Sequence, residues 1–217
     1  MIITTPNAPP TETSKQPLKG LLPNELAEFF VSIGEPKYRA QQVFKRLYAH
    51  QTYSFDDMTE LPASLRKHLC HVSDIHPLAP SRLQESADGT KKFLFRLSDG
   101  REIETVLIPS ESVEEDGAPK RLTLCVSTQV GCALNCKFCA TASLKMKRNL
   151  SAGEIVEQFL QAQQHSDKPI TNLVFMGMGE PLLNYNNVLK SIERITASDS
   201  MAMSPKRITV STAGVAK

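Results

Sequence analysis

The sequence predicts an α/β protein with a helical N-terminal region, and three features carry this prediction. Apolar residues recur at helical spacing between about residues 21 and 70. Two strand-like runs, 92–97 and 102–108, then flank a turn. From residue 121 onward, strand-like and helix-like segments alternate, as in parallel sheets and barrels. We therefore expect four regions: a disordered tail over 1–20, a small helical domain over 21–90, a β-hairpin with a loop over 91–120, and the first three βα units of a barrel over 121–217.

The N-terminal regions are predicted from composition and apolar spacing. Residues 1–20 are rich in Pro, Thr, Ser and Asn without periodicity, which is typical of a mobile tail. A first helix is expected around 24–30, and Pro62 suits the first turn of a third helix. The second helix would place four apolar residues on one face, namely Ala40, Val43, Phe44 and Leu47.

The hairpin and the barrel region are predicted from turn and capping residues. Asp99-Gly100 supplies the positive φ angles of a tight turn, and Ser151 with Glu154 forms a capping box that starts a helix over 151–164. The other expected elements are strands over 121–128, 172–176 and 207–211, a helix over 187–196, and loops over 111–120, 132–150 and 177–184. Three parallel strands cannot close a barrel, so we expect the chain to be part of a longer protein.

Composition limits the class of protein. Hydrophobic residues make up 41% and charged residues 22% of the chain, as in ordinary globular proteins. No apolar run approaches the roughly 20 residues of a membrane span, and the N-terminus lacks a signal-peptide layout, so we expect a cytoplasmic protein. A net charge of +2 neither requires nor excludes a nucleic-acid partner.

Cysteine spacing is the strongest chemical signal. Four of the five cysteines lie within residues 125–139, a poor disulfide framework that favours metal binding. Cys132, Cys136 and Cys139 can ligate three irons of a [4Fe–4S] cluster and leave the fourth iron open. S-adenosyl-L-methionine (SAM) suits that iron, because its amino and carboxylate groups chelate one metal. The alternative is a zinc site with Cys125 as fourth ligand, although zinc usually draws paired cysteines from separate knuckles.

Two later strand ends are weaker candidates for a ligand site. The apolar strand before Gly177-Met178-Gly179-Glu180 runs into a turn whose glycines let a ligand approach the backbone closely. The third strand ends in Ser211-Thr212, with hydroxyl groups at the matching level of the sheet. An ordinary turn and a capped strand end remain the structural alternatives.

Cys125 and Glu104 are candidates of a different kind. Alternation along 122–127 turns Cys125 away from Leu122, Leu124 and Val126, toward the interior of the predicted barrel. A buried inert thiol is an equally good interpretation from the pattern alone. Glu104 lies on the second hairpin strand, where a solvated carboxylate is the simpler interpretation, and Cys70 is expected to be structural.

Several segments together resemble one enzyme family. These are residues 103–109, 123–141, 148–150, 175–182 and 211–215. They resemble the RlmN-type dual-specificity adenosine-C2 RNA methyltransferases, and the likeness runs from about Leu21 to Lys217. The resemblance implies a partial radical SAM barrel, a helical domain that is a candidate for RNA binding, and methylation of carbon 2 of adenosine in 23S rRNA and tRNA. It also implies an electron donor such as flavodoxin or ferredoxin.

The resemblance further implies roles for individual residues. Cys132, Cys136 and Cys139 would bind the cluster, and Gly179, Glu180 and Ser211 would contact SAM. In the family, a methylated cysteine near the C-terminal end loses hydrogen to a deoxyadenosyl radical and adds to the base. Glu104 matches the proposed proton acceptor, and Cys125 matches the cysteine that releases the product with formation of a disulfide.

One departure and two alternatives accompany this resemblance. No cysteine follows Cys139, so the methyl-carrying cysteine is missing and we expect the 217-residue chain alone not to methylate RNA. A related enzyme that methylates carbon 8 of the same rRNA adenosine shares the cluster. A non-catalytic metal- and RNA-binding protein is the third possibility, with a basic edge formed by Lys137, Lys145, Lys147 and Arg148.

Overall fold

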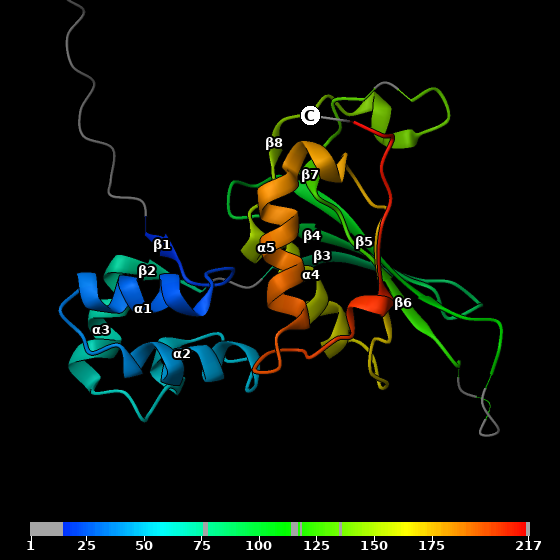
Figure 1. Ribbon diagram of the computed structural model, residues 1–217. Helices are drawn as coiled ribbons and strands as arrows, with labels where there is room; N and C mark the ends of the chain where they lie inside the picture. The colour runs from blue at the N-terminus through cyan, green and yellow to red at the C-terminus, as the bar shows by residue number, and fades with distance from the viewer. Residues whose placement is uncertain (1–14, 76–77, 114–116, 118, 135, 216–217) are drawn as a thin grey trace, which may run out of the picture.

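The structure is a computed structural model that describes residues 15–75, 78–113, 117, 119–134 and 136–215. Its centre is a six-stranded sheet in the order β10-β9-β6-β5-β4-β3. Helices α4 and α5 lie together beside this sheet, and the N-terminal helices α1 to α3 form a separate layer at one end (Figure 1). The strands are β1 (Gln16–Pro17), β2 (Ser73–Asp74), β3 (Ala79–Glu85), β4 (Lys91–Arg96), β5 (Glu102–Pro109), β6 (Leu122–Cys125), β7 (Gln129–Val130), β8 (Arg148–Asn149), β9 (Asn172–Phe175) and β10 (Ile208–Val210).

The helices agree with the sequence prediction. They are α1 (Pro23–Ser32), α2 (Tyr38–Tyr48), α3 (Ala63–Val72), α4 (Ala152–Gln164) and α5 (Tyr185–Thr196), with short 3-10 turns at Phe55–Asp57, Ala140–Ser143, Pro181–Asn184 and Pro205–Arg207. The capping box at α4 is present, because Ser151 Oγ accepts from Glu154 N and Glu154 Oε2 accepts from Ser151 N. Helix α5 starts two residues before the predicted boundary.

The parallel half of the sheet confirms the predicted βα order. β6 pairs with β9 and β9 with β10, both in parallel. The helices α4 and α5 form the connections, so the described residues contain two βα units and the strand of a third, one helix fewer than the three predicted units require. Strand β6 is shorter than predicted, because its pairing with β5 ends at Cys125 and Val126 bonds only to the segment around β9.

Three predictions about the first half were wrong. The predicted tail is ordered over residues 15–20, where β1 pairs with β2 and Leu18 is buried, whereas residues 1–14 lie outside the described residues. The predicted helical domain includes a strand, β3, which is mostly exposed and carries Pro80 beside a register shift. An edge strand of this kind has no apolar alternation to reveal it. The hairpin is also part of the barrel sheet, because β5 pairs with β6.

The turn between β4 and β5 differs from its prediction. Only Gly100 has a positive φ, of 79°, whereas Asp99 does not. Gly100 N donates to Leu97 O and Leu97 N donates to Arg101 O, which makes a three-residue loop with a bulge at the glycine. The hairpin was therefore predicted correctly, but its turn is one residue longer.

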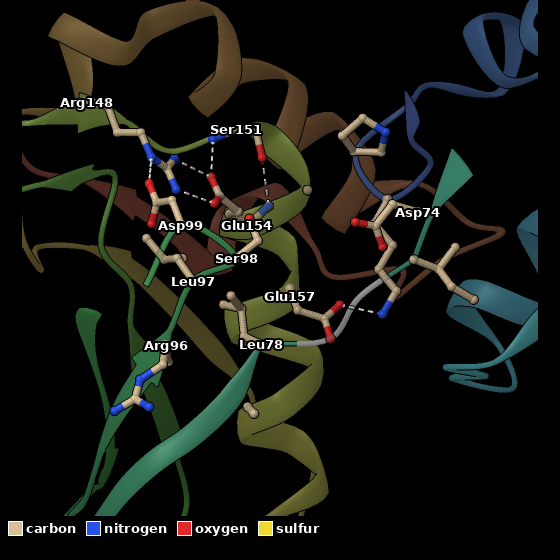
Figure 2. A pocket seen from close by; sticks show the side chains of 15 residues that line it. Asp74, Leu78, Arg96, Leu97, Ser98, Asp99, Arg148, Ser151, Glu154 and Glu157 are labelled. Carbon is tan, nitrogen blue, oxygen red and sulfur yellow. Dashed lines mark hydrogen bonds and ion pairs between the residues drawn. The ribbon is translucent and has the colours of Figure 1, made fainter. Parts of the chain in front are cut away.

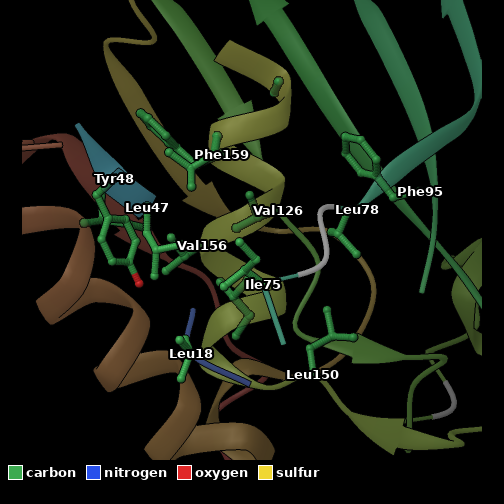
Figure 3. Close-up of a cluster of buried hydrophobic side chains, with 14 of the residues drawn as sticks. Leu18, Leu47, Tyr48, Ile75, Leu78, Phe95, Val126, Leu150, Val156 and Phe159 are labelled. Atoms are coloured by element: carbon green, nitrogen blue, oxygen red, sulfur yellow. The ribbon is translucent and has the colours of Figure 1, made fainter. Parts of the chain in front are cut away.

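One hydrophobic core joins the helical layer to the sheet. Figure 3 shows Val156 and Phe159 of α4 between Leu47 of α2 and Phe95 of β4, and all four belong to one buried cluster. The helix face of the sheet is apolar, since Leu124 and other inward residues are fully buried. Burial of this apolar area is the main stabilising contribution to the fold.

Residues 15–20 are held to α4 by a buried ion pair and a close backbone contact. Lys19 Nζ lies 2.6 Å from Glu157 Oε2, and both side chains are almost completely buried. A Cβ on Gly20 would lie 2.2 Å from Gly153 N, so only glycine fits this contact. Burial lowers the pKa of Lys19, although Glu157 opposes that shift. A pocket lies at this junction (Figure 2); of the residues predicted for the functional site, Arg148 of the basic edge lines it, whereas the predicted cluster, SAM and catalytic residues do not.

Within the part of the chain described by the structure, no helix is both long and apolar enough to span a bilayer.

Candidate functional site

The carboxyl ends of β6, β9 and β10 meet at one edge of the sheet, because the three strands are parallel. The cysteine loop, residues 131–147, follows β6 and the short β7 strand. The glycine loop, residues 176–180, follows β9, and residues 211–215 follow β10. Ligand sites in α/β folds lie at this edge, so the structure brings the three predicted segments to one place.

The cysteine loop is closed at its base by backbone pairing. Strands β7 and β8 pair through Gln129 with Asn149 and through Val130 with Arg148. Gly131 has a φ of 76°, and a Cβ there would lie 2.5 Å from Lys145 O. The loop can therefore start and end at adjacent positions only with glycine at residue 131.

The three predicted cluster ligands lie in this loop with accessible thiols. Cys132 and Cys136 are half-buried and Cys139 is exposed. Cys139 N donates to Cys136 O at 3.0 Å, so the last two cysteines belong to one tight turn. Leu134 N donates to Cys132 Sγ at 3.4 Å, so the start of the loop turns back on its first cysteine. Three soft thiolate donors in one short loop fit an iron–sulfur cluster.

Among the described residues, no three His, Cys, Asp or Glu side chains are grouped to hold one metal ion. A four-iron cluster requires a different spacing, because each thiolate binds its own iron. Cys125 lies on β6, outside the loop, so the structure provides no preformed zinc site with Cys125 as fourth ligand. All five cysteines are free, and no disulfide supports that part of the sequence prediction.

Basic residues on the cysteine loop divide into two kinds. Lys137, Lys145 and Lys147 are exposed. Arg148 is not free to bind phosphates, as the predicted basic edge would require. Its Nη1 and Nη2 donate to Glu154 at 2.9 and 2.8 Å, and its Nε donates to Asp99 at 2.6 Å. The hydrogen bond from Arg148, together with those from Arg101, holds the pKa of Asp99 well below its usual range. Arg148 thus joins the hairpin turn, the end of the cysteine loop and the start of α4, as Figure 2 shows.

The glycine loop packs tightly against the segment that follows β6. A Cβ on Gly177 would lie 2.7 Å from Ser127 Oγ, and one on Gly179 would lie 2.6 Å from Gln129 Cβ. Gly179 also has a φ of 102°. Contacts within the protein therefore require glycine at both positions. From the sequence alone, these glycines were explained by the close approach of a ligand.

Glu180 connects the second and third strand ends. Its carboxylate is buried and accepts hydrogen bonds from Leu182 N, Ala213 N and Thr212 Oγ1 at 3.0, 2.9 and 2.6 Å. Burial raises the pKa of this carboxyl, but the three hydrogen bonds outweigh burial and leave the pKa below its ordinary value. Ser211 is exposed beside this contact, and its backbone N donates to Phe175 O at 3.4 Å.

Three buried polar residues that the sequence analysis did not single out hold the site together. Gln129 Oε1 accepts from Glu180 N, and Gln129 Nε2 donates to Asn149. Asn184 Nδ2 donates to both Thr128 O and Leu150 O. Gln158 of α4 binds the backbone of Ser127. In the sequence, the available signal for these residues was a polar side chain among apolar neighbours. Their hydrogen-bond partners could not be predicted, because these partners are distant in sequence.

Cys125 and Glu104 lie on the face of the sheet opposite the helices. Cys125 is half-buried and pairs with Val106 across β5, two residues from Glu104. Diagonal neighbours of this kind lie about 7–8 Å apart. Burial raises the pKa of the Cys125 thiol. The Glu104 carboxylate is half-exposed and lies 3.0 Å from Lys92 Nζ. The sheet therefore brings the two predicted catalytic residues onto one face.

The comparisons with known proteins agree with these features. Residues 16–75 match the family described as the ribosomal RNA large subunit methyltransferase N-terminal domain, and residues 126–217 match the radical SAM superfamily. A probable dual-specificity RNA methyltransferase RlmN from Christiangramia forsetii is 45% identical over 94% of this chain and 56% of the relative. The dual-specificity RNA methyltransferase RlmN of Geobacter sulfurreducens is 47% identical over 91% of this chain and 52% of its own length.

A solved structure shows the same fold. The crystal structure of a radical SAM methyltransferase from Sphaerobacter thermophilus superposes with a TM-score of 0.80 at 40% identity, over 92% of this chain and 57% of that chain. The chain thus spans just over half the length of the relatives it matches. Both the helical layer and the parallel strands are covered by these matches. The chain therefore resembles the RlmN-type radical SAM proteins: residues 16–75 match their N-terminal domain and residues 126–217 match the radical SAM superfamily.

Proposed function

We propose that the protein is a radical SAM RNA methyltransferase that modifies carbon 2 of adenosine in 23S rRNA and tRNA. The main support is that the cysteine loop lies at the carboxyl edge of the sheet that carries Glu104 and Cys125 on its open face. Relatives named as dual-specificity RNA methyltransferases favour carbon 2 over carbon 8. The activity itself is inferred from relatives of which the chain covers 52–58%.

Cys132, Cys136 and Cys139 are the proposed ligands of a [4Fe–4S] cluster, and Gly179, Glu180 and Ser211 are the proposed contacts for SAM. When bound, the cluster supplies an electron that opens SAM. A carboxylate has about four lone-pair positions, and the Glu180 carboxylate uses three of them on protein donors. One position thus remains for a cationic amino group.

Glu104 and Cys125 have separate proposed roles. The half-exposed carboxylate of Glu104 can accept a proton from a base placed over the open face. The Cys125 thiol has a raised pKa, so at neutral pH it is protonated and a weak nucleophile. Once deprotonated, its sulfur would attack the sulfur of the cysteine that is linked to the base through a CH2 group. The new S–S bond would replace the S–CH2 bond, and the carbon would keep that electron pair and take up a proton to become the methyl group.

RNA is the proposed partner of the cysteine-loop surface. A hollow beside the loop is lined by three cationic side chains, those of Arg101, Lys145 and Lys147. Cations on this rim suit backbone phosphates. An electron donor such as flavodoxin or ferredoxin is the second proposed partner. We place the protein in the cytoplasm, because five free cysteines suit a reducing compartment.

The metal site is tested on the 217-residue chain purified without oxygen. About four irons per chain support the proposal, and one zinc per chain without iron would contradict it. Methyl transfer is tested on the full-length product of the gene, with SAM, a reductant and unmodified RNA. Formation of 2-methyladenosine supports the function, whereas 8-methyladenosine or no product argues against it.

The role of Cys125 is tested in the same full-length protein. Cys125→Ala should retain iron, because the residue lies outside the cysteine loop, but should accumulate a covalent protein–RNA complex. The complex would migrate with the protein on a denaturing gel. Cys70→Ala is the matched control, since Cys70 is an exposed thiol on α3, far from the site. Normal turnover of Cys125→Ala would make Cys125 a packing residue.

A further inference from the structure

The backbone of Glu104 lies just beyond the paired part of β5 and β6. The last paired residues of the two strands are Val106 and Cys125. At Val126 the backbone bonds toward β9 and the glycine loop, and not toward β5, since Val126 N donates to Val174 O and Gly177 N donates to Val126 O. The side of Glu104 that faces β6 therefore has no backbone partner, and buried backbone groups require one.

Two side chains supply the missing partners of Glu104. Ser127 Oγ donates to Glu104 O at 2.6 Å, and Glu104 N donates to Met178 Sδ at 3.4 Å. Met178 N in turn donates to Ser127 Oγ at 2.9 Å. The backbone of Glu104 is thus held by residues from two of the strand-end loops that form the site.

Gln158 fixes Ser127 from the helix side. Its Oε1 accepts from Ser127 N at 2.8 Å and from Thr105 Oγ1 at 2.7 Å, and its Nε2 donates to Ser127 O at 3.0 Å. Ser127, Gln158 and Thr105 are each 0% exposed. Because Thr105 is adjacent to Glu104, one buried amide controls both the partner of Glu104 and its neighbour on β5.

We propose that Ser127 and Met178, held by Gln158, are positioning residues for Glu104. Among the described residues, the Glu104 carboxylate is bound by Lys92 at 3.0 Å, and both side chains are about half exposed, so this ion pair holds the carboxylate weakly. The buried hydrogen bonds fix the backbone from which the side chain extends, and with it the distance to Cys125. The inference deepens the proposed function, on which its catalytic consequence rests.

Hydrogen exchange of the Glu104 amide in the 217-residue chain tests the geometry without any activity. Ser127→Ala removes the hydroxyl, and Met178→Leu removes the sulfur acceptor while keeping the size of the side chain. Each should speed exchange at Glu104 roughly 10-fold. Ser127→Thr keeps the hydroxyl and should restore slow exchange. Ser191→Ala is the control, because Ser191 is an equally buried serine whose Oγ donates to Val188 O on α5.

Methylation by the full-length gene product tests the consequence for catalysis. Misplacing Glu104 should lower kcat roughly 10- to 100-fold in Ser127→Ala with little change in KM for RNA. Ser127→Thr should recover most of kcat, and Ser191→Ala should match the unchanged protein. A normal kcat in Ser127→Ala would overturn the positioning role.

The two measurements separate this inference from the proposed function. Unchanged exchange at Glu104 in both Ser127→Ala and Met178→Leu overturns the inference, whatever the activity. If Ser127→Ala does not fold, hydrogen exchange in Met178→Leu still tests whether these side chains hold the backbone of Glu104. Replacing Met by Leu usually costs little stability, so this variant should fold. If the unchanged protein does not methylate adenosine, the proposed function fails, and the exchange result still decides whether these residues position Glu104.

Discussion

The glycine loop and the cysteine loop follow neighbouring parallel strands, yet the protein holds them in opposite ways. The glycine loop is packed against Ser127 and Gln129, and Glu180 at its end is buried and hydrogen-bonded. The cysteine loop is fixed at its base, but Cys139 is exposed and Phe138 is 94% exposed. The glycine loop is thus held in place by contacts within the protein. The cysteine loop instead presents exposed side chains whose positions a bound ligand would have to fix.

This difference follows from the chemistry each loop is proposed to perform. Hydrogen bonds that orient a ligand are effective only when they are formed before the ligand binds. Thiolates that bind metal need to reach their irons, and metal binding itself supplies the ordering free energy. We therefore expect substitutions in the glycine loop to affect folding, and substitutions of the cluster cysteines to affect metal binding.

The largest expected effect on stability is that of Gly179→Ala. The new Cβ would meet Gln129, and the backbone has a φ of 102°. Overpacking and the left-handed backbone together should cost roughly 3 kcal/mol of unfolding free energy, measured by urea denaturation. Gly34→Ala is the control, because Gly34 has a φ of 81° with no atom within 4 Å of the new Cβ. Equal losses would show that the glycine loop is not tightly packed.

Glu180→Gln should cost about 2 kcal/mol at neutral pH, since charge-assisted hydrogen bonds become neutral ones and one donor loses its partner. The folded pKa of Glu180 is below the ordinary value of 4.5, so its carboxylate stabilises the fold fully above pH 4.5 and this stabilisation is lost as pH falls through the folded pKa. Thermal unfolding as a function of pH checks this.

The control for that experiment is Glu28→Gln, an exposed carboxylate on α1. It should change the unfolding free energy by no more than about 0.5 kcal/mol. If the difference between wild type and Glu180→Gln stays constant from pH 7 to pH 3, the charge of Glu180 does not stabilise the strand ends.

Arg148→Lys should have a smaller effect, about 1 kcal/mol. Lysine cannot reproduce the two hydrogen bonds to Glu154 together with the one to Asp99. Part of the loss should disappear at high salt, because all three side chains are partly accessible. Arg96→Lys is the control variant, because Arg96 forms an ion pair with Glu102 on an exposed surface and its replacement should cost less. A similar loss in both variants would contradict a special anchoring role for Arg148.

The smallest expected effect on stability is that of Cys139→Ser in the metal-free chain. An exposed thiol contributes little to packing, so the unfolding free energy should change by no more than about 0.5 kcal/mol. Iron binding, measured by anaerobic reconstitution, should nevertheless fall sharply. Cys70→Ser, also exposed, should leave both quantities unchanged. Full iron content in Cys139→Ser would remove it from the ligand set.

The sequence by itself determined the features that depend on neighbouring residues. Periodicity located α2, the capping box at Ser151 located the start of α4, and alternation separated Leu124 from Cys125. The spacing of Cys132, Cys136 and Cys139 predicted a metal site in the loop after the first parallel strand. These features are local, because helix periodicity, caps and short ligand motifs act over a few residues.

Only the tertiary structure decided what depends on distant partners. Residues 15–20 are ordered because Lys19 pairs with Glu157, which is 138 residues away. Strand β3 exists because β4 offers it an edge, and Arg148 is removed from the basic surface by Asp99. Glu180 is hydrogen-bonded because Thr212 and Ala213 reach it from the segment that follows β10. The free energy of each such contact depends on two segments at once, so no pattern within either segment could predict it.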